Sequence, residues 1–461
     1  MQHAPLCHPG RAPRVSLAIA AETAQLSAMT PGARLSAAIE VLADIETRRR
    51  PATDALKDWG LAHRFAGSGD RAAIAGVVYD ALRRKASAAF VIGESTARAF
   101  VLGMLALERK LDLAAIARLV EDGRHAPGAL SESERARLAA PSLDCAPAWI
   151  TGDYPEWLDP QLARTFGDDR VAEGTALASR APLDLRVNTL KGSREEAAAA
   201  LAHLKPQPTR WSPVGLRIAM APDAKSPAIH AEPPFLKGLI EVQDEGSQIA
   251  ALCAGAKSGE HVVDLCAGAG GKTLALAAAM EGRGQIYAAD SDKRRLAPIH
   301  ARIERAGAHN IQVRTPKGQA APLDDLAGRA DVVLIDAPCT GTGAWRRNPD
   351  AKWRVRPGAL AMRLKEQAAV LDLAAALTKP SGRVVYITCS VLAEENGDQV
   401  RGFLNRHPQF VAVPPTDVAG ALGERAFMFR RAVLMSEEGL LMTPRRTDTD
   451  GFYVAVMMRK D

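Results

Sequence analysis

Cysteine is scarce in this chain and its cysteines stand far apart. The 461 residues include six cysteines, and no two of them form a Cys-x-x-Cys pair. Such scattered residues exclude a disulfide framework, and without close pairs a zinc site is not expected. The sequence therefore predicts a protein of a reducing compartment, the cytoplasm, that uses no metal.

Long apolar runs are also absent, as are internal repeats. A membrane-spanning helix needs about 20 consecutive apolar residues, and no segment approaches that length. The apolar run at residues 15–21 follows arginines but is short, and Glu22 interrupts it, which argues against a secretory signal peptide. We therefore expect no membrane partner.

The composition is that of an ordinary globular protein with a basic charge balance. Hydrophobic residues make up 47% of the chain and charged residues 24%. A chain of 461 residues is too long for one core, so two or three domains are expected. The net charge of +6 favours a polyanionic partner. Basic runs at residues 48–50 and 83–85 concentrate this charge, although either run alone is better explained as a solvated helix face.

The apolar patterns divide the chain into four parts. Residues 1–28 lack a periodic apolar face, which predicts a disordered leader with Met29 as the effective start. Helical spacing of apolar residues predicts an all-helical domain over residues 29–145. Residues 150–232 mix strand and helix patterns and predict a small α+β module. Strands alternate with helices over residues 235–461, which predicts a doubly wound parallel sheet with ligands at the carboxyl ends of its strands.

One stretch of the α/β part combines a strand, a glycine loop and a helix. Residues 261–273 are His-Val-Val-Asp-Leu-Cys-Ala-Gly-Ala-Gly-Gly-Lys-Thr, and the alanine-rich residues 274–280 predict a helix. This arrangement surrounds a ligand with backbone N–H groups and a helix N-terminus. A glycine loop that merely turns the chain is the simpler alternative.

Three kinds of nucleotide site begin with such a loop. A P-loop requires glycine five residues before Gly271, where this chain has Cys266. A dinucleotide-binding loop starting at Gly268 requires glycine or alanine where Thr273 stands. An S-adenosylmethionine site needs an acid after the next strand to hold the ribose, and the next buried-strand pattern ends in Asp290. The sequence therefore favours the third kind of site.

Two cysteines follow predicted buried strands at the ligand edge of the sheet. Cys339 comes after Asp336-Ala-Pro, and Cys389 comes after Thr388. A cysteine at a strand end is usually a small buried hydrophobe, but two at one edge favour thiols that take part in chemistry. Asp336 alone also matches the acid of a nucleotide hydrolase, which predicts magnesium and needs no thiols. Cys266 is interpreted as structural or as a backbone contact.

Several longer pieces of the chain carry a resemblance to a known family. The main pieces are Asp264-Leu-Cys-Ala-Gly-Ala-Gly-Gly-Lys-Thr273, Asp336-Ala-Pro-Cys-Thr-Gly-Thr-Gly343, Arg346-Arg-Asn-Pro-Asp-Ala-Lys-Trp353 and Tyr386-Ile-Thr-Cys-Ser-Val-Leu-Ala-Glu-Glu-Asn396. They resemble the Sun/RsmB family of RNA cytosine-5 methyltransferases. Its flanking signatures are similar to Arg186-Val-Asn-Thr-Leu-Lys191, Val242-Gln-Asp-Glu-Gly-Ser-Gln248 and Asp450-Gly-Phe-Tyr453. The helical part, with Gly69-Asp-Arg-Ala and Val78-Tyr-Asp-Ala-Leu-Arg-Arg84, resembles the NusB-like RNA-binding domain of the RsmB branch.

The resemblance implies an enzyme that transfers a methyl group from S-adenosylmethionine to carbon 5 of a cytosine in small-subunit ribosomal RNA. It implies a Rossmann-like class I methyltransferase sheet, preceded by an all-α NusB-like domain and a small α+β RNA-binding module. By the same resemblance, Cys389 is the nucleophile that adds to carbon 6 of the base. Cys339 assists breakdown of the adduct, and Asp336 holds the base edge. We expect a monomer.

The resemblance also assigns the cofactor and RNA contacts. The cofactor-binding residues are Cys266, Ala267, Gly268, Ala269, Gly270, Gly271 and Lys272 of the loop, together with Asp290 and Asp336. The RNA-binding residues are Arg186, Asn188 and Lys191. The chain departs from the family at Ala269, where proline is usual, and this is expected to loosen the loop. Lys317 stands in the region of the family's adenine-contacting acid, and the nearest acids are Asp324 and Asp325.

Two alternatives stay open at this point. A P-loop-like nucleotide hydrolase is disfavoured by Cys266 and by two thiols that it would not use. An RNA-binding ribosome assembly factor with a vestigial methyltransferase fold is disfavoured by the intact Cys389, Cys339 and Asp336, while Lys317 is consistent with it. Binding of S-adenosylmethionine rather than ATP distinguishes the two enzymes, and transfer of labelled methyl to RNA excludes the assembly factor.

A chain that begins at Met29 is expected to match the full chain in melting temperature and in methyl transfer, because residues 1–28 have no apolar face to pack. Thermal denaturation and a labelled-methyl assay on both chains measure this. A clear loss of either property in the shorter chain would show that the leader is part of the fold.

Overall fold

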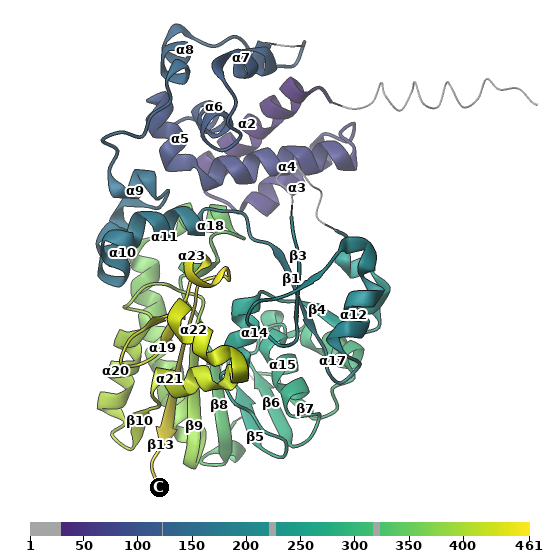
Figure 1. The fold of residues 1–461 in the computed structure, drawn as a ribbon, viewed down its shortest axis with the longest axis vertical. Helices are drawn as coiled ribbons and strands as arrows, with labels where there is room; N and C mark the ends of the chain where they lie inside the picture. The colour runs from purple at the N-terminus through teal and green to yellow at the C-terminus, as the bar shows by residue number, and fades with distance from the viewer. Residues whose placement is uncertain (1–28, 122, 221–226, 317–322) are drawn as a thin grey trace, which may run out of the picture. The chain divides into compact units, whose positions relative to one another are not determined.

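The computed structural model describes residues 29–121, 123–220, 227–316 and 323–461 (Figure 1). The chain divides into two units, Met1–Ser142 and Leu143–Asp461. The predicted leader at residues 1–28 and Lys317 lie outside the described residues. Within the described ranges, no single helix has the length and apolar character needed to cross a membrane.

The regular elements described in the first unit are all helices. They are Pro31–Arg48 (α2), Ala52–Ala62 (α3), Ser68–Arg83 (α4), Lys85–Ile92 (α5), Ala97–Leu107 (α6), Leu113–Glu121 (α7) and Glu132–Ala139 (α8). The Thr30 side chain caps α2 by accepting a hydrogen bond from the Ala33 N–H. A Cβ on Gly103 of α6 would lie 2.5 Å from the Ala88 Cα of α5. Glycine at this position therefore lets α5 and α6 pack backbone to backbone.

The second unit begins with helices and a small antiparallel sheet. Its helices are Ala148–Thr151 (α9), Asp159–Phe166 (α10), Arg170–Leu177 (α11), Arg194–Ala200 (α12) and Pro233–Leu236 (α13). The strands Leu183–Val187 (β1), Gln207–Pro208 (β2), Gly215–Ile218 (β3) and Ile240–Val242 (β4) lie in the order β2-β3-β1-β4. Alternation along β1 directs Leu185 and Val187 into a core with Leu216 and Ile240. β4 extends this sheet beyond residue 232.

The rest of the second unit is built on a nine-stranded sheet. Its strands are His261–Asp264 (β5), Gln285–Ala289 (β6), Ile311–Arg314 (β7), Ala330–Asp336 (β8), Thr378–Thr388 (β9), Phe410–Ala412 (β10), Leu434–Met435 (β11), Leu440–Met442 (β12) and Phe452–Arg459 (β13). They lie in the order β11-β12-β13-β9-β8-β5-β6-β7, with β10 paired to β13. Strands β9, β8, β5, β6 and β7 run parallel. The predicted Rossmann-like α/β fold is therefore confirmed.

One edge of the predicted doubly wound parallel sheet is antiparallel, so the sheet is mixed. β13 runs opposite to β9, with Tyr453 paired to Thr388 and Met458 paired to Arg383. Because β13 runs opposite to β9, the chain enters β13 at the edge where β9 ends, and β12 pairs antiparallel with the other side of β13. This reversal places Phe452 and the residues before it beside the carboxyl ends of the parallel strands.

Helices cover both faces of the large sheet (Figure 1). The helices of this part of the chain are Glu245–Leu252 (α14), Gly271–Ala279 (α15), Lys293–Leu296 (α16), Ile299–Ala306 (α17), Pro349–Arg354 (α18), Pro357–Leu377 (α19), Gly397–Arg406 (α20), Pro415–Val418 (α21), Ala426–Ala432 (α22) and Pro444–Thr447 (α23). In β8, Val333 and Ile335 belong to the core that includes α19 and α20. Val332 and Leu334 belong to the core that includes α14 and α15. Burial on both faces explains why this strand is a continuous apolar run.

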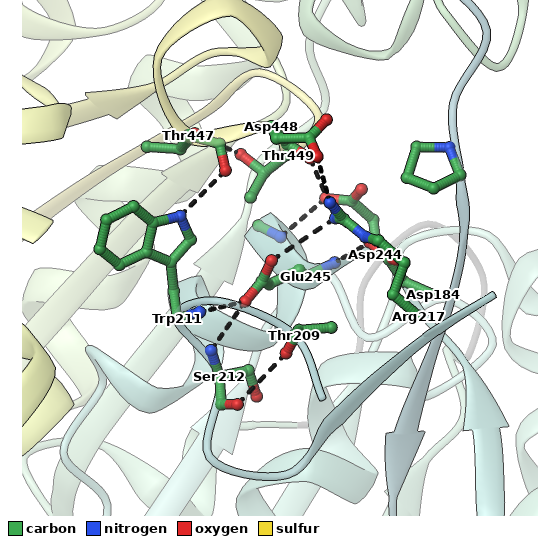
Figure 2. Close-up of polar contacts among 12 residues, drawn as sticks. Asp184, Thr209, Trp211, Ser212, Arg217, Asp244, Glu245, Thr447, Asp448 and Thr449 are labelled. Atoms are coloured by element: carbon green, nitrogen blue, oxygen red, sulfur yellow. Dashed lines mark hydrogen bonds and ion pairs between the residues drawn. The ribbon is translucent and has the colours of Figure 1, made fainter. Parts of the chain in front are cut away.

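A buried polar network joins the small sheet to the large one (Figure 2). The Glu245 carboxylate, at the start of α14, accepts hydrogen bonds from the backbone N–H groups of Trp211 at 2.5 Å and Ser212 at 2.8 Å. Burial raises the pKa of Glu245, and these N–H groups oppose that rise. The Trp211 indole donates to the Thr447 carbonyl at 2.9 Å. The small sheet is therefore fastened to the segment that leads into β13.

Close backbone contact docks the small sheet on the end of α17. The Asn188 side-chain amide donates to the Gly238 carbonyl at 3.0 Å and to the Ala306 carbonyl at 2.9 Å. Gly238 has a φ of +74°, and a Cβ there would lie 1.9 Å from the Arg305 carbonyl oxygen. Only glycine meets both the conformational and the packing demand at this position.

Gly238→Ala is expected to lower the free energy of unfolding by about 3 kcal/mol or more, because a left-handed backbone penalty of about 1–2 kcal/mol adds to the clash with Arg305. Gly255→Ala is the matched control, since Gly255 has a φ of +58° but no atom within 4 Å of the added Cβ. Denaturant unfolding of both variants measures the difference. Equal losses in the two variants would show that the contact with α17 contributes nothing beyond backbone conformation.

Candidate active site

The two cysteines singled out in the sequence meet at the carboxyl edge of the parallel strands. β8 and β9 pair in parallel with Asp336 opposite Ile387, so the chain leaves both strands at the same edge. Cys339 follows β8 and Cys389 follows β9, and their Sγ atoms lie 3.4 Å apart. The expectation that both would open onto one edge therefore describes their geometry correctly.

The environment of Cys339 keeps its thiol protonated. Its hydrogen bond with Cys389 and its burial both raise the pKa of Cys339 well above the ordinary value, and the charge of Glu395 adds to the rise. The two sulfurs lie within hydrogen-bond distance, and either thiol can donate to the other. Burial, reinforced by Asp264 and Asp290, likewise raises the pKa of Cys266, which fits the structural role expected for that residue.

A buried carboxylate holds the loop that carries Cys339. Glu395 accepts hydrogen bonds from the Thr340 backbone N–H at 2.8 Å and from the Thr340 hydroxyl at 2.5 Å. The Gln367 amide of α19 donates to Glu395 at 3.0 Å and to the Pro338 carbonyl at 2.9 Å. In the sequence Glu395 stands only as one residue of a motif, and nothing there indicates this function, because Thr340 and Gln367 lie far away in the chain.

Asp336 has a buried cationic partner that the sequence did not indicate. The Lys272 ammonium lies 2.7 Å from an Asp336 carboxylate oxygen and 5.0 Å from the centre of the Phe452 ring. The Lys272 side chain is only 7% exposed, and a lysine this deeply buried requires a compensating charge. The predicted role of Lys272 is a cofactor contact. The ion pair shows that Lys272 also positions the Asp336 carboxylate.

The glycine loop between β5 and α15 forms an open cradle. Gly268 has a φ of +50° and Gly270 a φ of +85°, and a Cβ on Gly270 would lie 2.5 Å from Ile299. A Cβ on Gly268 would meet no atom closer than 3.8 Å, and the same holds for Gly271. The loop therefore packs on one side at Gly270 and leaves its other side free for a ligand, which fits the methionine end of S-adenosylmethionine.

Asp290 is held in place by backbone donors. Its carboxylate accepts hydrogen bonds from the Gly268 N–H at 3.0 Å and from the Asp292 N–H at 2.9 Å. Asp290 thus links the end of β6 directly to the glycine loop, where an acid can reach a ribose hydroxyl. Arg302 of α17 donates to the Ala269 carbonyl at 2.8 Å, so the loop is fastened at the position where the family usually has proline.

The residues expected near the adenine lie partly outside the described residues. Lys317 is outside the described residues. Asp324 and Asp325 begin a short 3-10 helix, and Asp325 pairs with Arg314 at 2.8 Å. The departure noted at Lys317 therefore stays a prediction.

The three residues predicted to bind RNA have different exposures. Arg186 is buried and donates to the Gln243 side-chain oxygen at 2.6 Å, and burial lowers its pKa to about 10. Asn188 is also buried, and its amide makes the two docking hydrogen bonds described above. Lys191 is exposed. In this structure Arg186 and Asn188 brace the module, and an RNA contact by either stays a prediction.

Two arginines and two aspartates from three of the motifs that carry the resemblance form one largely buried cluster. Arg347 contacts Asp244 at 2.7 Å and Asp450 at 2.6 Å, and Arg346 contacts Asp450 at 2.5 Å. Burial and the charge of Asp244 raise the pKa of Asp450 to about 6. The pKa of Asp244 is lowered because Arg347 and Arg346 outweigh the effect of its burial. The cluster fixes the segment before β13 against the loop after Cys339.

The fold and this site define a class of protein. A parallel α/β sheet, a glycine cradle after β5 and a carboxylate at the end of β6 are the parts of a Rossmann-like class I methyltransferase. Enzymes of this class use S-adenosylmethionine as methyl donor, which confirms the predicted cofactor class.

Comparison with known proteins identifies the family. The family model described as 16S rRNA methyltransferase RsmB/F matches residues 251–458. A second model, the ferredoxin-like domain of RsmF/B-like methyltransferases, matches residues 154–225. Over these residues the chain matches the RsmB/F methyltransferase family, as the sequence motifs indicated.

Individual relatives agree with this assignment. The chain is 36% identical over 268 residues to the "Probable ribosomal RNA small subunit methyltransferase B" of Synechocystis, covering 57% of this chain and 58% of the relative. It is 33% identical over 313 residues to ribosomal RNA small subunit methyltransferase B of Salmonella newport, covering 67% of this chain and 66% of the relative. The matches therefore span less than two thirds of either relative. The crystal structure of PH0851 superposes with a TM-score of 0.68 at 26% identity, covering 93% of this chain and 99% of that one.

Asp264→Asn is expected to flatten the pH dependence of stability between about pH 4 and about pH 7. Burial raises the pKa of Asp264 to about 7 despite its hydrogen bond from Thr273, and the charge of Asp336 adds to the rise. Because the folded-state pKa lies above the unfolded value, the free energy of unfolding falls as pH increases through this window. The loss is complete above the folded-state pKa and is on the order of 4 kcal/mol.

Denaturant unfolding at a series of pH values measures this difference, since asparagine still accepts a hydrogen bond from Thr273 and cannot ionise. Asp324→Asn, at an exposed carboxyl, is the control and should leave the curve unchanged. Parallel curves for the native chain and Asp264→Asn would show that Asp264 is ionised throughout the window.

Proposed function

We propose that this chain transfers a methyl group from S-adenosylmethionine to carbon 5 of a cytosine in small-subunit ribosomal RNA. The observation that carries the proposal is the pair of thiols, 3.4 Å apart, at the ligand edge of a methyltransferase sheet. Methyl transfer to nitrogen or oxygen needs no thiol, whereas carbon 5 of cytosine is too weak a nucleophile without one. The names of the curated relatives support ribosomal RNA as the substrate.

Cys389 is the nucleophile in this proposal. Its thiolate adds to carbon 6, the carbon–sulfur bond forms, and the electron pair of the C5–C6 double bond moves to make carbon 5 nucleophilic. Asp336 holds the amino and N3 edge of the base, and Lys272 fixes that carboxylate through the 2.7 Å ion pair. When bound, S-adenosylmethionine would supply the methyl group to carbon 5, with its sulfur–methyl bond breaking to leave S-adenosylhomocysteine.

Cys339 acts when the adduct breaks down. The proton on carbon 5 leaves to water, its electron pair re-forms the C5–C6 double bond, and the carbon–sulfur bond breaks toward Cys389. The Cys339 thiol, whose pKa is raised, donates its S–H to the departing sulfur across the 3.4 Å contact. A protonated neighbour thus makes Cys389 a better leaving group.

The remaining residues bind and orient the two substrates. Cys266 through Lys272 line the cofactor's methionine end, where Gly268 and Gly271 leave space. Asp290 receives the ribose hydroxyls. Lys191 is the exposed RNA contact of the α+β module. The helical unit serves as a NusB-like RNA-binding domain, as the resemblance implies.

The two thiols should give opposite results when each is removed. Cys389→Ala is expected to bind RNA and cofactor without transferring methyl or forming an adduct. Cys339→Ala is expected to attack the base and then stall, so that a protein–RNA species accumulates and survives denaturing electrophoresis. The double variant should behave like Cys389→Ala, because no species is trapped without the first attack.

Labelled-methyl transfer and denaturing gels measure these outcomes, with Cys145→Ala as the control for an exposed thiol. Trapping by Cys389→Ala and not by Cys339→Ala would mean that the roles are reversed. If the native chain binds RNA yet transfers no methyl group to it, the alternative of an assembly factor with a vestigial fold replaces this proposal.

A further inference from the structure

The basic runs of the helical unit are largely neutralised within the unit. Each of five basic side chains lies within 3.4 Å of a carboxylate: Arg48 with Asp44, Arg50 with Asp58, Arg83 with Asp80, Arg84 with Glu108 and Lys85 with Glu46. An RNA phosphate would have to compete with these partners. The charge runs seen in the sequence are therefore poor candidates for the main nucleic-acid contact.

The corner between α3 and α4 presents a different surface. Leu61 is 61% exposed and Phe65 is 66% exposed, which are high values for large apolar side chains. The corner is defined by residues 57–71, from the last turns of α3 to the start of α4. Such an exposed aromatic side chain indicates a surface that binds a partner.

Phe65 ends a fixed row of aromatic rings. The buried Trp59 donates its indole N–H to Glu40 at 3.0 Å. The His63 ring stacks on Trp59 at 4.3 Å between centroids with an interplanar angle of 15°. Phe65 meets His63 edge to face at 5.7 Å. The stacked rings already hold the Phe65 side chain in place. A planar ligand can therefore stack on Phe65 with little further loss of side-chain entropy.

Three cations on the same corner have no acidic partner in the part of the chain that the structure describes. Among the described residues, Lys57, Arg64 and Arg71 make no ion pair. The Arg71 side chain lies against α3, because a Cβ on Gly60 would be 3.5 Å from its Cδ. The acids on the same segments are engaged elsewhere: Asp58 pairs with Arg50 and Asp70 with Arg34. The corner therefore keeps uncompensated positive charge next to an exposed aromatic ring.

We propose that the α3–α4 corner binds single-stranded RNA, with a base stacked on Phe65 and phosphates held by Lys57, Arg64 and Arg71. Aromatic rings beside cations are the usual recognition surface for unpaired nucleotides. Each base has a flat face that can stack on a ring, and each phosphodiester carries a negative charge that attracts a cation. A duplex hides its base faces, so the corner selects unpaired RNA. The inference rests on the proposed function and identifies where the helical unit holds that substrate.

Phe65→Ala in the full-length chain is expected to raise the Kd for a labelled oligouridine about 5- to 50-fold, because one stacked base is lost. Phe65→Tyr should restore affinity, and binding of an RNA duplex should not change. Arg64→Ala with Arg71→Ala should lower the slope of log Kd against log salt by about 1.4, since each single-strand phosphate contact contributes about 0.7. Phe427→Ala, at a ring that is also 65% exposed, and Arg48→Ala, at a paired arginine, are the matched controls.

The inference is overturned if Phe65→Ala binds oligouridine like the native chain, or if single strand and duplex weaken equally. It is also overturned if the native chain self-associates in sedimentation and Phe65→Ala abolishes this, because the corner would then be a protein interface. If the native chain binds no RNA of any kind, the proposed function fails first. If the native chain binds RNA and Phe65→Ala binds it equally well, the RNA site at the α3–α4 corner is rejected and the proposed function is unaffected.

Discussion

The parallel pairing of β8 and β9 is the constraint on which the site depends. Because Asp336 lies opposite Ile387 in this register, both strands end at one edge and the loops that follow share the same space. The Cys339 and Cys389 sulfurs meet there. A slip of one residue would exchange the two faces of a strand that is buried on both sides, so the packed core protects the geometry of the thiols.

Features decided within a short segment could be predicted from the sequence, and features decided by distant pairing could not. The strand ends, the glycine cradle and Asp290 each follow from a few neighbouring residues. The antiparallel edge at β13 could not be seen, because a strand buried on both faces is apolar in either direction. The ion pair of Lys272 with Asp336 and the support of Thr340 by Glu395 depend on which loops the topology brings together.

Charge in the sequence is an unreliable guide to charge at the surface. The arginine-rich runs concentrate positive charge in the sequence, yet carboxylates of the same unit pair with most of their side chains. Asp44 and Asp80 lie one turn away on the same helix, whereas Glu108 and Glu46 are distant in the chain. Only tertiary structure shows which cations keep their charge uncompensated. The α3–α4 corner carries few basic residues. It is nevertheless a better candidate for RNA contact, because Phe65 is exposed and both Asp58 and Asp70 pair with arginines outside the corner.

The order of these residues along the chain matters during synthesis. Both thiols leave the ribosome before Asp450, Gly451 and β13. Until then Arg347 has only one of its two carboxylate partners, and β9 is an unpaired edge on the side where β13 will add. Gly343 also lacks the backbone of Gly451, which later packs directly against it. A nascent chain therefore carries its thiols on an unfinished sheet, and the native site forms only after β13 is made and paired.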